Sequence, residues 1–209
     1  MLRYVIVMLA CGVLGAANSS AEIFVDNKDM NNGRITNLVA TTNVTVGSEM
    51  GGATKYWYAT SGSGSVTYGY TFSLPIQSAS FYGNLLVNFT GDKVWLDVSR
   101  DGITFTNIYH ADTVGSLHPT NHGDPALAGP PPSFNLTSYL AGSNSAFIRA
   151  RMSGGIGSQF MRTADNIPGF NVPNVYQFSA VTVPEPSTYA LALAGLACGG
   201  WHLRRRRRA

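Results

Sequence analysis

The chain has 209 residues and a formal net charge of +3 at pH 7, but this charge is unevenly distributed. Between residues 22 and 183, eight Lys and Arg side chains stand against ten Asp and Glu side chains, so this body carries a charge near −2. The other six basic residues lie at the two ends, so the high pI is no sign of a nucleic-acid-binding surface, and no nucleic acid is expected as a partner.

Residues 1–21 have the composition of a secretion signal. Arg3 supplies a positive charge, Tyr4 to Ala17 form an apolar run, and residues 19–21 are small enough for a signal peptidase to accept. The run is too short for an ordinary membrane-spanning helix. We therefore predict export through the Sec translocon with cleavage before Glu22, the alternative being a buried N-terminal helix.

The body from residue 22 to residue 183 is long enough for one domain with its own hydrophobic core. Both cysteines, Cys11 and Cys198, lie in the terminal segments outside it. The body therefore has no disulfide or thiolate metal site, and its stability must come from packing.

Short alternating runs separated by turn residues are typical of β-strands. Such runs occur at residues 67–74, 93–99, 146–152 and 175–183, and the Asp101-Gly102 turn predicts that 103–109 returns antiparallel to 93–99. We predict an all-β fold, a β-sandwich or jelly roll of seven to nine strands, flanked by an N-terminal signal helix and a short C-terminal membrane helix.

The alternation in 93–99 assigns a face to each side chain. Val94, Leu96 and Val98 share one face, and Trp95 and Asp97 share the other. We expect Asp97 on the solvent side of an edge or outer-sheet strand, and Asp101 as a turn residue rather than a catalytic one.

Aromatic side chains in the body are candidates for sugar binding. The apolar face of a pyranose ring complements an aromatic plane, so Trp57, Tyr58 and Trp95 are candidate glycan-stacking residues, with packing in the core or across strands as the alternative.

A metal site is a second hypothesis. His110, Asp112, His118 and His122 could supply imidazole and carboxylate ligands to a divalent ion, but the surrounding Gly and Pro residues favour a solvated loop. No cofactor is expected apart from a structural calcium ion, for which Asp26, Asn27 and Asp29 offer oxygen ligands.

Part of the body resembles a galactose-binding-like jelly roll. The resemblance runs from about Gly47 to Val183 and rests on residues 70–75, the Ser-x-Asp-Gly hairpin in 98–105, residues 134–140 and the late strand 147–151. That family includes many carbohydrate-binding modules, but the fold alone does not identify a ligand.

The tail, residues 184–209, has three parts. Val183, Pro184, Glu185 and Pro186 begin a motif at 183–188 that the two prolines hold extended, and the apolar segment 189–203 follows. Five arginines then stop translocation and leave the body outside; they are Arg204, Arg205, Arg206, Arg207 and Arg208. The segment is short for a membrane span, so spanning requires arginine snorkelling and local bilayer thinning.

This arrangement closely resembles the PEP-CTERM sorting signal of Gram-negative bacteria. The resemblance implies recognition by an exosortase, passage through the inner membrane as a precursor, and release or transfer of the body to the cell surface or extracellular matrix, where such proteins accompany exopolysaccharide. An ordinary C-terminal membrane anchor is the alternative.

We therefore expect a non-enzymatic surface or matrix protein associated with exopolysaccharide and biofilm. A dedicated carbohydrate-binding module is the alternative. An extracellular hydrolase is the third class, but nothing in the sequence selects the pair of carboxylates that glycoside hydrolysis requires.

Overall fold

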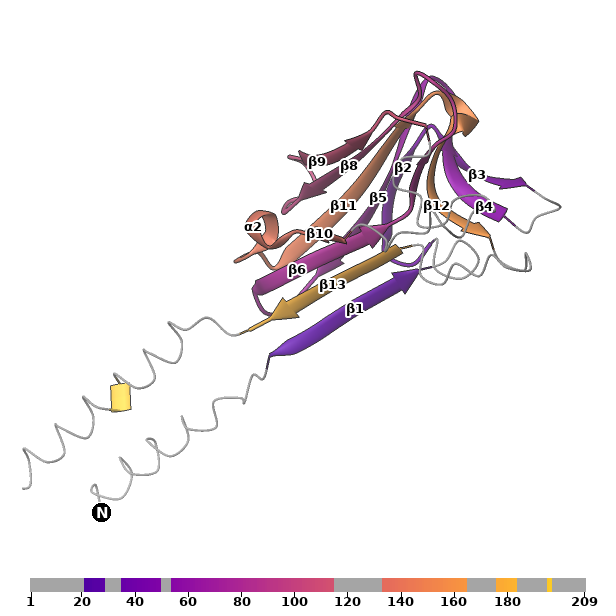
Figure 1. The fold of residues 1–209 in the computed structure, drawn as a ribbon. Helices are drawn as coiled ribbons and strands as arrows, with labels where there is room; N and C mark the ends of the chain where they lie inside the picture. Colours follow the sequence, from indigo (N-terminus) through magenta and orange to yellow (C-terminus); the bar gives the residue numbers. More distant parts are fainter. Residues whose placement is uncertain are drawn as a thin grey trace, which may run out of the picture. The chain divides into compact units, whose positions relative to one another are not determined.

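The computed structural model describes residues 21–28, 35–49, 54–114, 133–164, 176–183 and 195–196. These residues form thirteen β-strands in three antiparallel sheets, which confirms the all-β sandwich prediction (Figure 1). The chain divides into a compact unit from Ile23 to Thr182 and a second unit made of Met1–Glu22 and Val183–Ala209. In the second unit, residues 195 and 196 are helical. The sheets described below make up the first unit.

The five-stranded sheet contains the alternating runs seen in the sequence. Its order is β2 (Leu38–Thr42), β5 (Ser63–Thr71), β11 (Ser145–Ser153), β8 (Lys93–Ser99) and β9 (Thr106–Ala111). The bounds of β8 match the predicted strand, and its alternate residues Val94, Leu96 and Val98 are buried as predicted. Strand β5 begins earlier than predicted because residues 63–66 also pair with β11.

A four-stranded sheet packs on one face of the five-stranded sheet. Its order is β1 (Glu22–Lys28), β13 (Tyr176–Thr182), β6 (Ile76–Gly83) and β10 (Ser133–Asn135), and the short helix α2 (Thr137–Leu140) follows β10. The predicted last strand, 175–183, is β13 to within one residue at each end.

The third sheet continues the five-stranded sheet around a corner. Its order is β3 (Val44–Glu49), β4 (Thr54–Ala59), β12 (Ser158–Ala164) and β7 (Leu85–Val87), and these strands adjoin β2, β5, β11 and β8 along the chain. Figure 1 shows β11 passing into β12 at this corner, through the 3-10 turn η3 (Gly155–Gly157). When each bent strand is counted once, the described strands number nine, the upper end of the predicted range.

Each turn at the corner contains a residue with positive φ. These residues are Asn43 at 49°, Gly62 at 48°, Gly91 at 94° and Gly154 at 91°. Only glycine and, less readily, asparagine adopt this conformation at low cost, so these residue types permit the chain to bend there.

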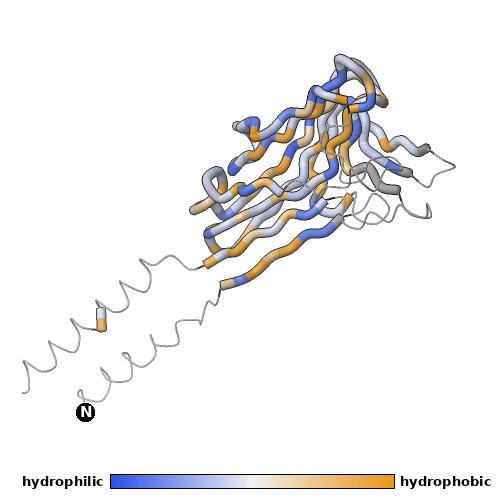
Figure 2. Tube along the Cα trace, in the orientation of Figure 1, coloured by the Kyte–Doolittle hydropathy of each residue, from blue (hydrophilic) through white to orange (hydrophobic). Residues whose placement is uncertain are grey.

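Aromatic rings fill the space between the five-stranded sheet and the four-stranded sheet that contains β13. Tyr70 of β5 stacks on Phe178 of β13 with ring centroids 4.4 Å apart, and Tyr68 lies 5.0 Å from Tyr176. The buried hydroxyl groups of Tyr70 and Tyr176 bond to each other at 2.6 Å, so the polar atoms of these rings are satisfied. Figure 2 shows the corresponding alternation of apolar and polar residues along the strands.

Candidate functional site

The face of the five-stranded sheet that points away from the aromatic core carries a cluster of charged and aromatic residues. The register places them in two rows across β11, β8 and β9. Arg151, Trp95 and His110 form one row, and Arg149, Asp97 and Asn107 form the next. We call these six residues the outer-face cluster.

Asp97 is the centre of the outer-face cluster. Arg151 donates to its carboxylate from Nε at 2.6 Å and from Nη2 at 3.0 Å, and Arg149 donates from Nε at 3.0 Å, with its Nη2 atom 2.9 Å from the same oxygen in an ion pair. The side-chain amide of Asn107 is the third group that donates to this carboxylate, at 2.9 Å. The carboxylate therefore receives hydrogen bonds from two neighbouring strands.

The prediction that Asp97 faces solvent is wrong. Asp97 is only 1% exposed, since β8 is an inner strand between β11 and β9 and the two arginines cover the carboxylate. Burial opposes its ionisation, but hydrogen bonds from Arg151, Asn107 and Arg149 outweigh burial and lower the pKa of Asp97 below its ordinary value.

Each arginine of the outer-face cluster also lies over an aromatic ring. The Arg149 guanidinium is 3.8 Å from the centroid of the Phe105 ring, and the Arg151 guanidinium is 5.0 Å from that of Trp95. Both distances are within the range of a cation–π contact. These contacts fix the planes of the two guanidinium groups, whose side chains remain 28% and 39% exposed.

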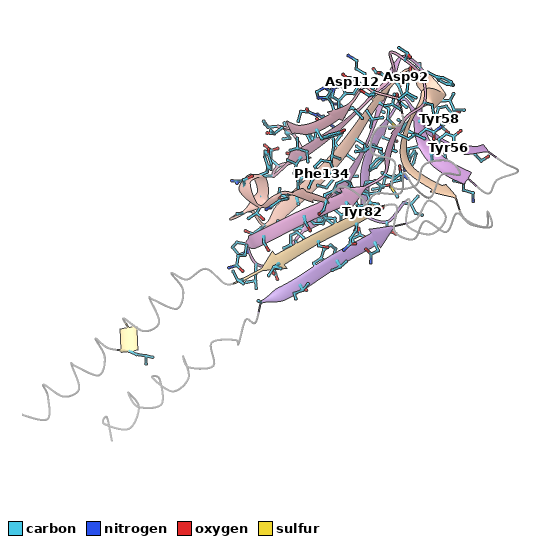
Figure 3. All side chains as sticks on the ribbon, viewed as in Figure 1. Tyr56, Tyr58, Tyr82, Asp92, Asp112 and Phe134 are labelled. Carbon is cyan, nitrogen blue, oxygen red and sulfur yellow. The ribbon has the colours of Figure 1, made fainter. Side chains whose placement is uncertain are left out.

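The three aromatic residues predicted from the sequence differ in accessibility. Trp57 is 7% exposed, and its indole N–H donates to the Tyr68 hydroxyl at 3.1 Å, so it is a core residue with no ring face free for a sugar. Tyr58 is half-buried beside Tyr56 on β4 (Figure 3). Trp95 is also half-buried and lies within the outer-face cluster.

The hypothesis of a metal site gains no support from the described residues. The Nε2 atom of His110 is 3.8 Å from the Oδ2 atom of Asp112, and His118 and His122 lie outside the described residues. Asp26 instead accepts a hydrogen bond from Asn37 at 2.9 Å, and Asp29 is not among the described residues. Within the described ranges, no three His, Cys, Asp or Glu side chains gather as a metal site would require.

Asp101 occupies the turn between β8 and β9, as predicted. Its carboxylate accepts hydrogen bonds from the backbone N–H groups of Ile103 and Thr104 and from the Ser99 hydroxyl, each at 2.8 Å. Together these bonds lower the pKa of Asp101 to about 2. Gly102 at φ 73° completes the turn, so Asp101 is explained by local structure.

An open groove of about 370 Å³ lies on the outer face of the four-stranded sheet formed by β1, β13, β6 and β10. It is bordered mainly by small and hydroxyl-bearing residues, including Ser78, Ser80, Ser133, Asn135 and Ser179. The groove has no aromatic or charged side chain in its lining, so it offers fewer means of holding a sugar than the outer-face cluster does.

Sequence reasoning found Trp95 but missed Phe105, Asn107, Arg149 and Arg151. The alternation of residues 147–151 shows that both arginines share a face, but it does not show which strand lies beside them. That pairing, Arg149 opposite Asp97 and Arg151 opposite Trp95, is set by the register of β11 and β8.

The end of the chain matches a known sorting signal. A family model described as the PEP-CTERM protein-sorting motif covers residues 182–208. The chain carries a PEP-CTERM sorting motif. This confirms the resemblance drawn from Val183 to Pro186, and it implies an exported protein with a C-terminal membrane anchor before processing. Beyond Val183, the motif lies almost wholly outside the described residues. Among the residues that are described, no helix has the length and apolarity needed to cross a bilayer.

Other comparisons concern the body. The solved structure of TmCBM61 in complex with β-1,4-galactotriose is similar at 10% identity and a TM-score of 0.35, covering 79% of this chain and 86% of that one. No curated protein matches the sequence.

Proposed function

We propose that this protein is a non-enzymatic component of the cell surface or extracellular matrix, delivered there by an exosortase that recognises its C-terminal motif. The observation that carries the proposal is the sorting motif at residues 182–208. In this account the β-sandwich is the functional part, and the two ends serve for export and sorting.

The tail has the physical properties that sorting requires. Pro184 and Pro186 restrict the backbone around Glu185 to an extended form, which a protease can bind as a strand. The arginines at 204–208 are costly to move across the membrane and are attracted to anionic lipid on the cytoplasmic side. The precursor therefore pauses in the inner membrane with its body outside and the motif near the membrane surface.

Replacing Pro184, Glu185 and Pro186 with alanine tests the sorting step. We expect the variant to accumulate in the membrane fraction as a precursor that keeps its tail, because the motif is lost while the apolar segment and arginines remain. Immunoblots of membrane and released fractions with a tag inside the body measure this. The control is Ser187→Ala with Thr188→Ala, which leaves the three motif residues intact. Unchanged release of the triple variant would refute exosortase sorting.

A dedicated carbohydrate-binding module is the second candidate. The observation in its favour is a half-buried Trp95 on a face that also presents arginine donors, the combination of an aromatic plane and polar groups that sugar sites use. We propose that the body contacts exopolysaccharide there. Co-sedimentation of residues 22–183 with exopolysaccharide from the producing strain, with and without calcium, tests this: saturable binding supports it, and no binding leaves a structural or protein-binding role.

A further inference from the structure

We propose that the outer-face cluster is a site for an acidic polysaccharide, in which the arginines bind the carboxylate of a uronic acid and Trp95 packs against a sugar ring. This inference rests on the proposed contact with exopolysaccharide and specifies its chemistry.

The charge balance of the outer-face cluster is the first reason. Arg149 and Arg151 share the single carboxylate of Asp97, so the triad keeps one positive charge in excess. Lys93 is exposed on the same face of β8, two residues before Trp95 and diagonal to Arg151. Asp112, whose Oδ2 atom is 3.8 Å from His110 Nε2, is an acidic side chain at the edge of this face, and Asp101 lies in the turn at its other end, where its carboxylate accepts hydrogen bonds from the turn itself. The face is therefore locally positive on a body whose total charge is near −2.

The geometry of the donors is the second reason. A guanidinium group has five N–H donors in a plane, and in each arginine two of its nitrogens lie within 3.0 Å of the Asp97 carboxylate. The remaining donors belong to side chains that are 28% and 39% exposed. Because Asp97, Phe105 and Trp95 hold the two planes in place, little conformational entropy is lost when a carboxylate binds them.

The position of Trp95 is the third reason. It lies between Arg151 and His110 in one row, and Arg149 and Asp97 form the adjacent row. A uronic acid has a carboxylate attached to a ring with an apolar face, so one residue of such a polymer can meet an arginine and the indole together. A neutral sugar would use only the ring contact.

A dense polyanion such as DNA fits these observations less well. Nucleic-acid sites neutralise many phosphates with many Lys and Arg residues, whereas this body is negative overall. A polymer with one negative charge per sugar fits better. Its carboxylates can pair with the excess positive charge of the Arg149–Asp97–Arg151 triad, and its rings can pack on the adjacent Trp95 indole.

Affinity electrophoresis of residues 22–183 tests the inference. This segment contains every buried core residue among those that the structure describes, and it includes the compact unit Ile23–Thr182, so it can be studied without the two ends. The gels contain polygalacturonate, its fully methyl-esterified form, or double-stranded DNA. We expect retardation by polygalacturonate and at least tenfold weaker retardation by the ester, which has the same rings without the charge.

Matched variants locate the site. Lys93→Gln is expected to weaken polygalacturonate binding about threefold, and Trp95→Ala roughly tenfold. Arg100→Gln is the control, because it removes the same charge from a side chain that points to the carbonyl of Tyr139 on α2. Arg151→Lys keeps a charge beside Asp97 but loses the planar fork, and should also weaken binding. Thermal unfolding of every variant verifies that it is folded.

The outcomes separate this inference from the function on which it rests. Equal binding of the ester and the acid would overturn the inference but leave a glycan-binding protein. Binding of DNA as tight as that of polygalacturonate would show a generic polyanion site and overturn it as well. If Arg100→Gln weakened binding as much as Lys93→Gln, the location would be wrong. Absence of binding to both polymers, together with no co-sedimentation with the strain's own exopolysaccharide, would refute the glycan contact itself.

Discussion

At the scale of single residues, two buried aspartates show how surroundings determine what a carboxylate contributes. Asp97 is held by two arginines and an asparagine, and its pKa is lowered. Asp92 is 8% exposed at the corner between β7 and β8 (Figure 3), and its Oδ2 atom has no hydrogen-bond partner within the described part of the chain. Desolvation raises the pKa of Asp92.

We predict that neutralising these two aspartates has opposite effects on stability. Asp97→Asn should lower the free energy of unfolding at neutral pH by about 2 kcal/mol, because it leaves two arginines without their counter-charge. Asp92→Asn should raise the melting temperature, because the variant no longer buries an unpaired charge.

The effects of these two aspartates on stability change with pH in opposite directions. The contribution of Asp97 is present above the ordinary aspartate pKa and is lost as pH falls through its lowered folded-state pKa. The cost of Asp92 is absent below the ordinary pKa and grows as pH rises through its raised folded-state pKa. Melting temperatures at pH 3 and pH 7 measure both, and a destabilised Asp92→Asn at pH 7 would contradict this account.

The sequence was informative for residues whose role follows from alternation alone. Val94, Leu96 and Val98 are buried as predicted because a strand alternates its faces. Asp97 was misassigned because the same rule makes the opposite face polar but does not reveal that an adjoining strand covers it with arginines. Trp57 lies in the core because its strand turns the indole toward Tyr68 of the next strand, a contact the local pattern does not contain.

At the scale of elements, the corner that joins two sheets contains glycines that differ in the space around them. A Cβ added at Gly154, where φ is 91°, would lie 1.7 Å from an oxygen of Asp92. A Cβ added at Gly91, where φ is 94°, would meet nothing within 4 Å. The two positions therefore have nearly the same φ and differ in steric contact.

This difference predicts unequal costs for two alanine substitutions. Gly91→Ala should cost about 1 kcal/mol of unfolding free energy from its positive φ alone. Gly154→Ala should cost on the order of 3 kcal/mol, since the new methyl group must also displace a buried carboxylate. Denaturant unfolding of both variants measures the difference, and equal costs would show that the corner adapts to the extra methyl group.

Turn chemistry shows what the sequence could and could not predict about elements. The Asp101-Gly102 turn was recognisable because its hydrogen bonds lie within a few residues of each other. The corner was not, because bending four adjacent strands at one level requires alignment of Asn43, Gly62, Gly91 and Gly154 by the sheet register. Each strand that bends at the corner appears as two short strands, so the thirteen described strands correspond to nine when each bent strand is counted once.

At the scale of the whole molecule, the ends were easier to interpret than the body. A sorting signal is a linear motif bound in extended form, so its residues are adjacent in the sequence and the match at 182–208 follows directly. The outer-face cluster draws its residues from β8, β9 and β11, and the Phe105 ring against Arg149 lies just before β9, so only folding brings these groups together. The function proposed for the chain therefore depends on the ends for location and on the sheet for binding.

The measurement that tests the central claim most directly is the mass and terminal sequence of the protein recovered from the surface or medium of the producing bacterium. The account predicts an N-terminus at Glu22 and a C-terminus near the Val183–Pro186 motif, without the arginines at 204–208. Recovery of a released protein that still ends in the arginine block would contradict processing by an exosortase.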